Sequence, residues 1–360
     1  MRTRILALAL LLSACGRTGL LAPARDGSAG GHAVGDGATG GWAGTVGNAT
    51  GGTSGRGCNA GEGAWCITEF PIATAGASSS RISAGPDGNL WFTESVAEKI
   101  GRITPDGVIT EFPLDVGQVG VYHHPYGITK GPDGALWFAE ATSGEIASIT
   151  TNGQITRQPR YRFGTPLAIV FAADGAVWLT GADGPILSLT LGGNIISHLT
   201  DPIVEWGELT TATDGAVWAC AVSGNLLGRC PLSGACTTLP LAAPASYPYG
   251  ITVGPDDAIW FTEVVGNRIG RVGPDGAIDE FALPTPSRGA RIITAGSDGA
   301  LWFTEYSTNQ IGRLTVDGQL DELEVPTPSI FPAGITAGPD GNVWFTEEGG
   351  NRIGRITLAR

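Results

Sequence analysis

The sequence predicts an all-β fold: a seven-bladed β-propeller with four-stranded blades, in which an N-terminal strand closes the ring by pairing with the C-terminal blade. Two observations support this prediction. The stretch 85–94, GPDGNLWFTE, is followed by six further copies. The tryptophans of these copies recur every 40 to 46 residues, at Trp91, Trp137, Trp178, Trp218, Trp260, Trp302 and Trp344. A period in the low forties with several short strands per unit is typical of propeller blades.

The first copy shows how each unit supplies its strands. Gly85-Pro86-Asp87-Gly88 favours a tight turn, because proline presets φ and glycine tolerates positive φ. The stretch that follows is apolar on successive residues, which is typical of a strand buried on both faces. In the next strand we expect Gly101 to let a tryptophan lie close to the backbone. The predicted strands are 90–93, 99–104 and 108–112, with 126–129 leading into the next unit.

The seventh unit lacks an outer strand of its own. It stops at 353–357, three strands into the pattern, whereas 67–71 repeats the outer strand 109–113 letter for letter. We therefore expect residues 67–72 to pair with the C-terminal unit. Such pairing removes the exposed sheet edges that an open array would leave.

The N-terminus predicts export and anchoring. Arg2 and Arg4 precede the apolar run 5–12, which is too short to span a membrane. Residues 1–15 resemble a bacterial lipoprotein signal that ends at a lipidated Cys15; the alternative is an ordinary secretory signal. Residues 16–57 are rich in Gly, Ala, Ser and Thr and are expected to be a disordered tether. The propeller is then expected over 58–360, on the bacterial cell envelope facing the periplasm or the exterior.

The cysteines are expected to be oxidised in that compartment. Cys58 and Cys66 favour a small disulfide loop. In the fourth unit, two of Cys220, Cys230 and Cys236 should bond, either 230 with 236 across a hairpin or 220 with 230 across adjacent strands. Zinc is disfavoured there, because Cys-x5-Cys has no histidine close by in the sequence.

Composition excludes one class of partner. The pI of about 4.7, with 21 Lys plus Arg and no basic run, argues against nucleic acid. We expect a monomer that touches the membrane through its lipid anchor only and whose unidentified ligand or protein partner binds at the propeller rim.

The repeated motifs Trp-Phe-Thr-Glu, Asn-Arg-Ile-Gly-Arg (267–271 and 351–355) and Ile-Thr-Glu-Phe-Pro resemble the virginiamycin B lyase family. The resemblance covers about residues 67–360. It implies a seven-bladed propeller whose enzymes open cyclic type B streptogramin antibiotics by magnesium-assisted elimination at the ester bond. It also implies histidines just before the inner strands of the last two blades, a magnesium-binding glutamate before the second histidine and another after the last tryptophan motif.

The equivalent positions in this chain carry other residues. Seven residues before each turn aspartate stand Ser80, Tyr126, Leu167, Gly207, Tyr249, Arg291 and Ala333. Arg291 takes the place of the sixth-blade histidine, and Phe331-Pro332-Ala333 that of Glu-Pro-His. Glu348 alone matches a magnesium ligand of the family. A general base contributes roughly 10² to 10⁴ to the rate of a catalysed reaction, so loss of the histidines is expected to slow the lyase reaction strongly. Two functions stay open. One is a binding module whose rim includes Tyr126, Tyr249, Arg291 and Tyr306, and the other is an active magnesium-dependent carbon–oxygen lyase.

Three further sets of residues have alternative interpretations. His124 could supply a base from the second blade, with a carboxylate such as Glu205, or could simply face solvent. His198 is expected on an outer strand with a structural role. The repeated glutamates could hold a divalent cation or pair with the arginines of the Ile-Gly-Arg motifs, and we expect the ion pairs. These glutamates are Glu94, Glu140, Glu263, Glu305 and Glu347.

Overall fold

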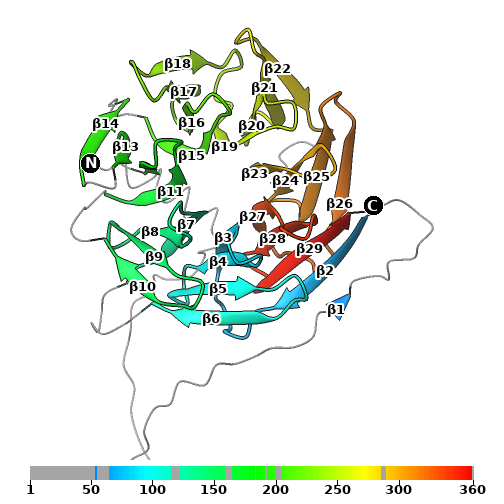
Figure 1. The fold of residues 1–360 in the computed structure, drawn as a ribbon. Helices are drawn as coiled ribbons and strands as arrows, with labels where there is room; N and C mark the ends of the chain where they lie inside the picture. The colour runs from blue at the N-terminus through cyan, green and yellow to red at the C-terminus, as the bar shows by residue number, and fades with distance from the viewer. Residues whose placement is uncertain are drawn as a thin grey trace, which may run out of the picture. The chain divides into compact units, whose positions relative to one another are not determined.

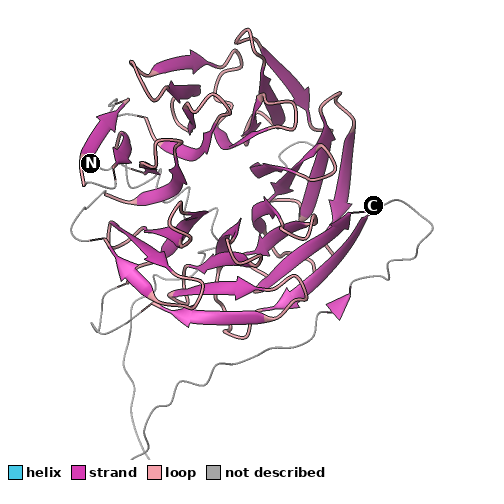
Figure 2. Cartoon of the chain, viewed as in Figure 1, coloured by secondary structure: helices cyan, strands magenta, loops and turns pink. Residues whose placement is uncertain are grey.

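The computed structural model describes residues 53–54, 65–114, 122–158, 164–182, 184–190, 193–199, 204–284 and 289–358. They belong to one compact unit, residues 47–360. Their regular elements are all strands (Figure 2). The described residues contain no helix with the length and apolarity that crossing a membrane requires. Cys15, Cys58 and most of the expected tether lie outside the described residues, so the anchor and tether stay predictions.

The strands form seven antiparallel sheets arranged as blades around a common centre, which confirms the predicted propeller (Figure 1). Blade 1 consists of β3 (Ser79–Ala84), β4 (Leu90–Glu94), β5 (Lys99–Ile103) and β6 (Ile109–Pro113). Blade 2 consists of β7 (Pro125–Lys130), β8 (Leu136–Glu140), β9 (Glu145–Ile149) and β10 (Ile155–Arg157). Blade 3 consists of β11 (Pro166–Phe171), β12 (Val177–Gly181), β13 (Ile186–Leu189) and β14 (Ile195–His198). Blade 4 consists of β15 (Trp206–Thr211), β16 (Val217–Ala221), β17 (Leu226–Cys230) and β18 (Thr237–Pro240). Blade 5 consists of β19 (Pro248–Val253), β20 (Ile259–Glu263), β21 (Arg268–Val272) and β22 (Ile278–Ala282). Blade 6 consists of β23 (Ala290–Ala295), β24 (Ala300–Glu305), β25 (Gln310–Thr315) and β26 (Leu320–Glu324).

Blade 7 joins the two ends of the propeller. Its inner strands are β27 (Pro332–Ala337), β28 (Val343–Glu347) and β29 (Arg352–Leu358), and its outer strand is β2 (Trp65–Pro71). All seven residues of β2 pair with β29, from Trp65 opposite Leu358 to Pro71 opposite Arg352. The closure that the sequence predicts is therefore confirmed, and Figure 1 shows blue β2 beside red β29. A short strand β1 (Thr53–Ser54), within the segment expected to be tether, adds to the edge of β2.

The repeat encodes a hydrogen bond that fixes each tryptophan. In blade 1 the Trp91 Nε1 donates to the turn carboxylate of Asp87 at 3.0 Å, and blades 2, 5, 6 and 7 repeat the bond. The indole lies against Gly85, where an added Cβ would come within 2.5 Å of it. Ala172 replaces that glycine in blade 3, and there Trp178 Nε1 has no hydrogen-bond partner among the described residues. The glycine that begins the turn thus admits the indole to its aspartate.

The glycine of the third strand has a different neighbour from the one we expected. An added Cβ at Gly101 would overlap the ring of Phe92, and Gly270, Gly312 and Gly354 face the equivalent phenylalanines. The ladder register explains this, because it sets Phe92 opposite Gly101 and Trp91 opposite Arg102. Within these blades, the buried phenylalanine and tryptophan rings therefore each pack against a different glycine of the same blade.

Candidate ligand site at the propeller axis

All seven inner strands are irregular near their first residues. The register of each against its neighbour shifts there, between Ser79 and Ile82 in blade 1 and at the equivalent points in the other blades. Bulges of this kind re-aim side chains and are common beside functional sites. We call the face at which the inner strands begin the axial rim; it includes the loops before β3, β7, β19, β23 and β27 and the loops that hydrogen-bond to them, such as the one containing Tyr306.

Side chains from four blades meet through these bulges. The guanidinium of Arg81, on β3 of blade 1, bonds Glu208 Oε1, on β15 of blade 4, through Nη2 at 2.7 Å and Nε at 2.9 Å. The same Nη2 donates to the Tyr249 hydroxyl of blade 5 at 3.1 Å. The guanidinium also lies 4.4 Å from the ring centre of Tyr126 of blade 2. Only near the axis can side chains from such distant blades touch, so these residues mark the centre of the ring.

A second arginine extends the network into blades 6 and 7. Arg291 Nη2 donates to the Tyr126 hydroxyl at 3.2 Å, and that hydroxyl lies 3.4 Å from the hydroxyl of Tyr249. The Arg291 guanidinium lies 4.8 Å from the ring centre of Tyr306 and 3.7 Å from the Glu348 carboxylate. Arg291 is 7% exposed, so its charge is held inside the ring. The axial network therefore has two arginines, two glutamates and three tyrosines.

Arg81 keeps its positive charge at physiological pH. Burial alone would lower the pKa of Arg81, but Glu208, Tyr126 and Tyr249 together raise it above its ordinary value. An arginine so held can donate hydrogen bonds and stack on rings, but it cannot accept a proton from a substrate. The network suits recognition of a ligand better than proton abstraction.

The structure brings the predicted rim residues Tyr126, Tyr249, Arg291 and Tyr306 together with Glu348, whereas sequence reasoning missed Arg81 and Glu208. A signal for the missing pair was present. Inner strands of blades 2, 5 and 7 share the pattern x-Gly-Ile-Thr, and opposite charges replace its glycine in Ser80-Arg81-Ile82-Ser83 and Gly207-Glu208-Leu209-Thr210.

His124 lies on the axial rim of blade 2 but contacts other residues than the axial network. Its Nδ1 hydrogen-bonds the Thr142 hydroxyl at 2.8 Å, and its Nε2 is 3.7 Å from Glu98. The ring is exposed. Glu205, the carboxylate suggested as its partner, lies just before β15 in blade 4, where its backbone N–H donates to the Ser223 hydroxyl oxygen at 2.9 Å. The neighbouring His123 is buried and bonds Glu140 at 2.9 Å.

The expected ion pairs between the repeated glutamates and the Ile-Gly-Arg arginines are wrong. Antiparallel pairing sets Trp260 opposite Arg271 and Glu263 opposite Arg268, so the motif arginine lies at the other end of the blade from the glutamate. There Arg271 bonds the turn carboxylate of Asp256 at 2.7 Å. A metal site built from the glutamates is not found either, since the described residues contain one group of three metal-ligating side chains and no glutamate belongs to it.

Three of the repeated glutamates instead lie beside a second carboxylate: Glu94 beside Glu111, Glu263 beside Glu280 and Glu347 beside Glu69. Burial, and then the neighbouring Glu111, raises the pKa of Glu94 to about 9. Burial and Glu69 raise the pKa of Glu347 to about 9 in the same way. The carboxyl oxygens of Glu94 and Glu347 accept no hydrogen bond from the described residues. Both are therefore protonated at neutral pH, when each can itself donate to its neighbour.

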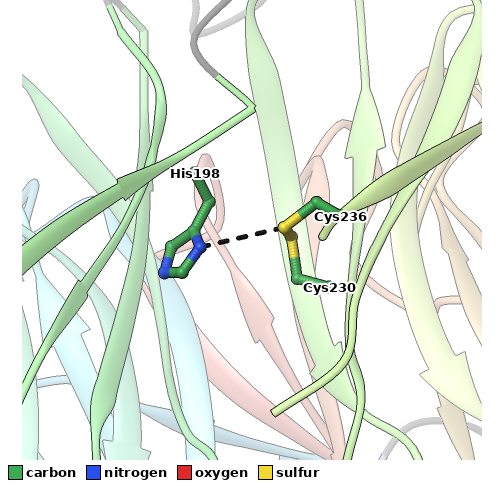
Figure 3. A group of neighbouring side chains, drawn as sticks. All are labelled: His198, Cys230 and Cys236. Atoms are coloured by element: carbon green, nitrogen blue, oxygen red, sulfur yellow. Dashed lines mark hydrogen bonds between the residues drawn. A yellow bond between two sulfur atoms is a disulfide. The ribbon is translucent and has the colours of Figure 1, made fainter. Parts of the chain in front are cut away.

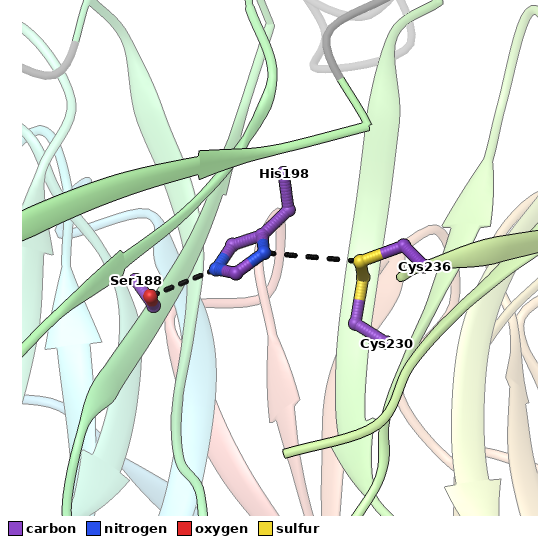
Figure 4. The surroundings of a disulfide bond; sticks show 4 residues. All are labelled: Ser188, His198, Cys230 and Cys236. Carbon is purple, nitrogen blue, oxygen red and sulfur yellow. Dashed lines mark hydrogen bonds between the residues drawn. A yellow bond between two sulfur atoms is a disulfide. The ribbon is translucent and has the colours of Figure 1, made fainter. Parts of the chain in front are cut away.

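Among the described residues, the group of three metal-ligating side chains is His198, Cys230 and Cys236 (Figure 3). Cys230 and Cys236 form a disulfide, which decides between the two predicted pairings and leaves Cys220 as a buried thiol. His198 lies on β14 with its Nε2 on the Ser188 hydroxyl at 2.8 Å and its Nδ1 3.8 Å from the Cys236 sulfur (Figure 4). Its ring stacks on Trp178 with centres 4.2 Å apart, and burial lowers its pKa. A packing role for His198 fits these contacts. Cys66 is also disulfide-bonded, but Cys58 lies outside the described residues, so that pairing stays a prediction.

Comparison with known proteins places the chain in a family. The model of the virginiamycin B lyase family matches residues 49–162 and 160–360. The chain belongs to that family. Virginiamycin B lyases of Bordetella parapertussis and Bordetella bronchiseptica are 42% identical to it over 48 residues. That match spans 13% of this chain and 16% of each relative.

Solved structures of the family extend the similarity to nearly whole chains. A streptogramin B lyase structure superposes with a TM-score of 0.76 and 32% identity, over 82% of this chain and 98% of the other. Virginiamycin B lyase from Staphylococcus aureus gives 0.75 and 34%, over 82% and 100%. A catalytically inactive histidine-to-alanine variant of the latter, with quinupristin, gives the same values.

Proposed function

We propose that this member of the virginiamycin B lyase family is an envelope-anchored propeller that binds a ligand or a partner protein at its axial rim without efficient lyase activity. One observation carries the proposal: the positions that the family resemblance assigns to the catalytic histidines hold Arg291 and Ala333. Arg291 donates a hydrogen bond to the Tyr126 hydroxyl and lies over the ring of Tyr306, and Ala333 is fully buried. Neither residue can take up a proton at neutral pH.

The residues present do not fit the magnesium ion that the family resemblance implies. Glu348 is the one matching carboxylate, and it faces the Arg291 guanidinium at 3.7 Å and the Ser78 hydroxyl at 3.4 Å. Phe331 stands where the second carboxylate ligand is expected. Magnesium prefers octahedral oxygen ligation, which a carboxylate already next to a cation and a phenyl ring does not supply. The axial network itself can hold an amphipathic ligand, through tyrosine rings and hydroxyl and guanidinium donors.

A type B streptogramin tests the absence of lyase activity. Purified protein with excess magnesium should open quinupristin no faster than a control without protein, while the Staphylococcus aureus enzyme serves as the positive control. Changing Arg291→His, Phe331→Glu and Ala333→His together should give detectable ring opening, whereas single changes should not, because such groups act as a unit. Magnesium-dependent ring opening by the unaltered protein would disprove the proposal.

The second candidate function is a magnesium-dependent carbon–oxygen lyase for type B streptogramins, which would make the protein an antibiotic-inactivating enzyme. Its support is the near-complete structural match at 32 to 34% identity. In that case the base has to come from another blade, and His124 is an exposed histidine on the axial rim. Loss of ring opening in a His124→Ala variant would favour this function.

The anchor belongs to the same proposal. Lipidation of Cys15 would tether the axial rim to the cell envelope as a monomer that contacts the membrane through its lipid only, with no role in nucleic-acid binding. Cys15→Ala should move the protein from the membrane fraction to a soluble form. The same fractionation for both proteins, or a mature N-terminus other than Cys15 by mass spectrometry, would contradict the lipid anchor.

A further inference from the structure

Blade 4 replaces an apolar pair of the repeat with two cysteines. In five other blades the hairpin between the third and fourth strands sets two apolar side chains opposite each other. These pairs are Ile103 with Ile109, Ile149 with Ile155, Leu189 with Ile195, Val272 with Ile278 and Leu314 with Leu320. Cys230 and Cys236 stand at this place in blade 4, next to the paired Arg229 and Thr237. Closing the hairpin therefore does not by itself require cysteines.

His198 of blade 3 takes the place of a phenylalanine in the same way. In blades 1, 5 and 7 the outer-strand residue that stacks on the tryptophan of the blade is Phe112, Phe281 or Phe70, with ring centres 5.3 to 5.6 Å apart. His198 stacks on Trp178 from the equivalent ladder position, opposite the isoleucine of the third strand. A phenyl ring would fill this space, so the imidazole adds a nitrogen ligand that packing does not require.

Ser188 of blade 3 orients that imidazole. It stands opposite Trp178, where blades 1, 4, 5, 6 and 7 have an arginine whose guanidinium lies over the tryptophan ring, and blade 2 also has serine there. The Ser188 hydroxyl hydrogen-bonds His198 Nε2 at 2.8 Å, which leaves Nδ1 facing the Cys236 sulfur (Figure 4). Histidines that bind metals are commonly held through their second ring nitrogen in this way.

The three ligand atoms already lie close together. His198 Nδ1 and the sulfurs of Cys230 and Cys236 are all within 4.8 Å of one another (Figure 3). A tetrahedral zinc ion, with Zn–S of about 2.3 Å and Zn–N of about 2.0 Å, holds its ligand atoms about 3.6 Å apart. The distance from His198 Nδ1 to the Cys236 sulfur is 3.8 Å, close to that value. Opening of the disulfide is therefore the main change that zinc binding requires.

We infer that His198, Cys230 and Cys236 form a zinc site that becomes available when a dithiol reduces the disulfide. Cys236 is half-buried and Cys230 is fully buried, so a thiolate of the dithiol attacks the Cys236 sulfur and the Cys230 sulfur leaves as a thiolate. The second thiol of the dithiol then displaces Cys236, so the reductant becomes a disulfide and the protein holds two thiols. Zinc binds both sulfurs as thiolates, releases their protons and takes the imidazole Nδ1 as third ligand, with water in the fourth position.

Zinc connects two blades that the disulfide does not connect. The disulfide joins the end of β17 to the residue before β18 within blade 4, whereas His198 is on β14 of blade 3. Strands β14 and β18 lie at the periphery of the ring (Figure 1). The site is thus separate from the axial network and independent of the proposed function. The spacing of the cysteines does not reveal it, because the third ligand comes from the neighbouring blade.

The experiment compares zinc binding by oxidised and reduced protein. The purified protein is reduced with dithiothreitol, desalted without oxygen and given zinc chloride. Bound zinc is then counted by elemental mass spectrometry, and the Kd is measured by competition with a chromogenic chelator. His198→Phe is the matched variant, because it restores the residue of other blades and keeps the disulfide. Cys230→Val/Cys236→Ile restores the apolar pair of blade 5. Both variants keep the other cysteines, so zinc bound elsewhere cancels in the comparison.

Reduction should let the unaltered protein bind one further zinc ion per chain, with a Kd below about 1 μM. His198→Phe should raise this Kd at least about 100-fold and Ser188→Ala about tenfold. Cys230→Val/Cys236→Ile should gain no zinc at this site on reduction. At a hundredfold excess over the Kd, zinc should raise the melting temperature of the reduced unaltered protein by about 4 °C.

Three results would overturn the inference: equal zinc binding by the oxidised and reduced protein, equal binding by the reduced unaltered protein and His198→Phe, or no zinc bound after reduction. Reduction could also unfold blade 4 when zinc is absent. Zinc should then restore the near-ultraviolet circular dichroism of the unaltered protein but not that of His198→Phe, and failure of this recovery would equally overturn the inference.

Discussion

Arg81 and Glu208 form a buried ion pair between blades 1 and 4, with a 2.7 Å contact between residues 127 positions apart in the sequence. The side chains are 7% and 19% exposed. Removing a charge from water is costly, and the mutual attraction offsets that cost only when both partners are present. Loss of either charge should therefore destabilise the axial network more than loss of both.

We expect Arg81→Met or Glu208→Met alone to lower the free energy of unfolding by about 3 kcal/mol or more, because each leaves a buried charge without its partner. The double variant should recover most of that loss. Urea unfolding of the four proteins gives the coupling between the two residues. The exposed pair Arg229 and Asp214, at 2.6 Å, supplies the control, and Arg229→Met should cost less than about 1 kcal/mol. Additive losses at Arg81 and Glu208 would show that the two do not act as a pair.

The raised pKa values of Glu94 and Glu347 make stability depend on pH. In the unfolded chain these carboxyls titrate near 4.5, whereas in the folded protein they hold their protons to about 9. The folded state therefore binds more protons between these values, and the stability that the two groups contribute below the lower pKa is lost as the pH rises through the upper one.

We expect the free energy of unfolding to fall as the pH rises from about 5 to about 9, by at most about 1.4 kcal/mol per pH unit for each group. Glu94→Gln/Glu347→Gln should flatten this dependence and raise stability most near the alkaline end, since glutamine cannot ionise. Urea unfolding across the range measures it, with Glu324→Gln at an exposed position as the control. An unchanged slope in the double glutamine variant would show that these carboxyls ionise without cost in the fold.

The fold was predictable because the same turn, strand and glycine motifs recur in successive units of the sequence. The turn aspartate, the tryptophan and the glycine recur together, and the match between 67–71 and 109–113 identifies the closing strand. Ladder register was the first source of error. Pairing of Glu263 with Arg271 looked natural from their repeated occurrence, but the hairpin sets Glu263 opposite Arg268.

The site was less predictable, because it depends on departures from the repeat. Arg81 and Glu208 each replace the glycine of the inner-strand pattern in a different blade. That they meet across the axis follows from the structure of the bulged inner strands and is not visible in the sequence. His198 and Cys236 likewise come from different blades, so their contact is invisible in the local spacing of the cysteines.

The last prediction concerns ring closure by β2. Phe70 of this strand stacks on Trp344 of blade 7 with centres 5.6 Å apart, and Arg352 bonds the buried Glu69 at 3.2 Å. A chain that begins at residue 73 would lose these contacts and expose the edge of β29, so its melting temperature should fall by more than about 10 °C, with aggregation. A chain that begins at residue 53 keeps β1 and β2 and should have the same melting temperature as the full-length protein. Phe70→Ala should have an intermediate effect, through loss of a buried ring. If the two shortened chains melted at the same temperature, β2 would not be what closes the propeller.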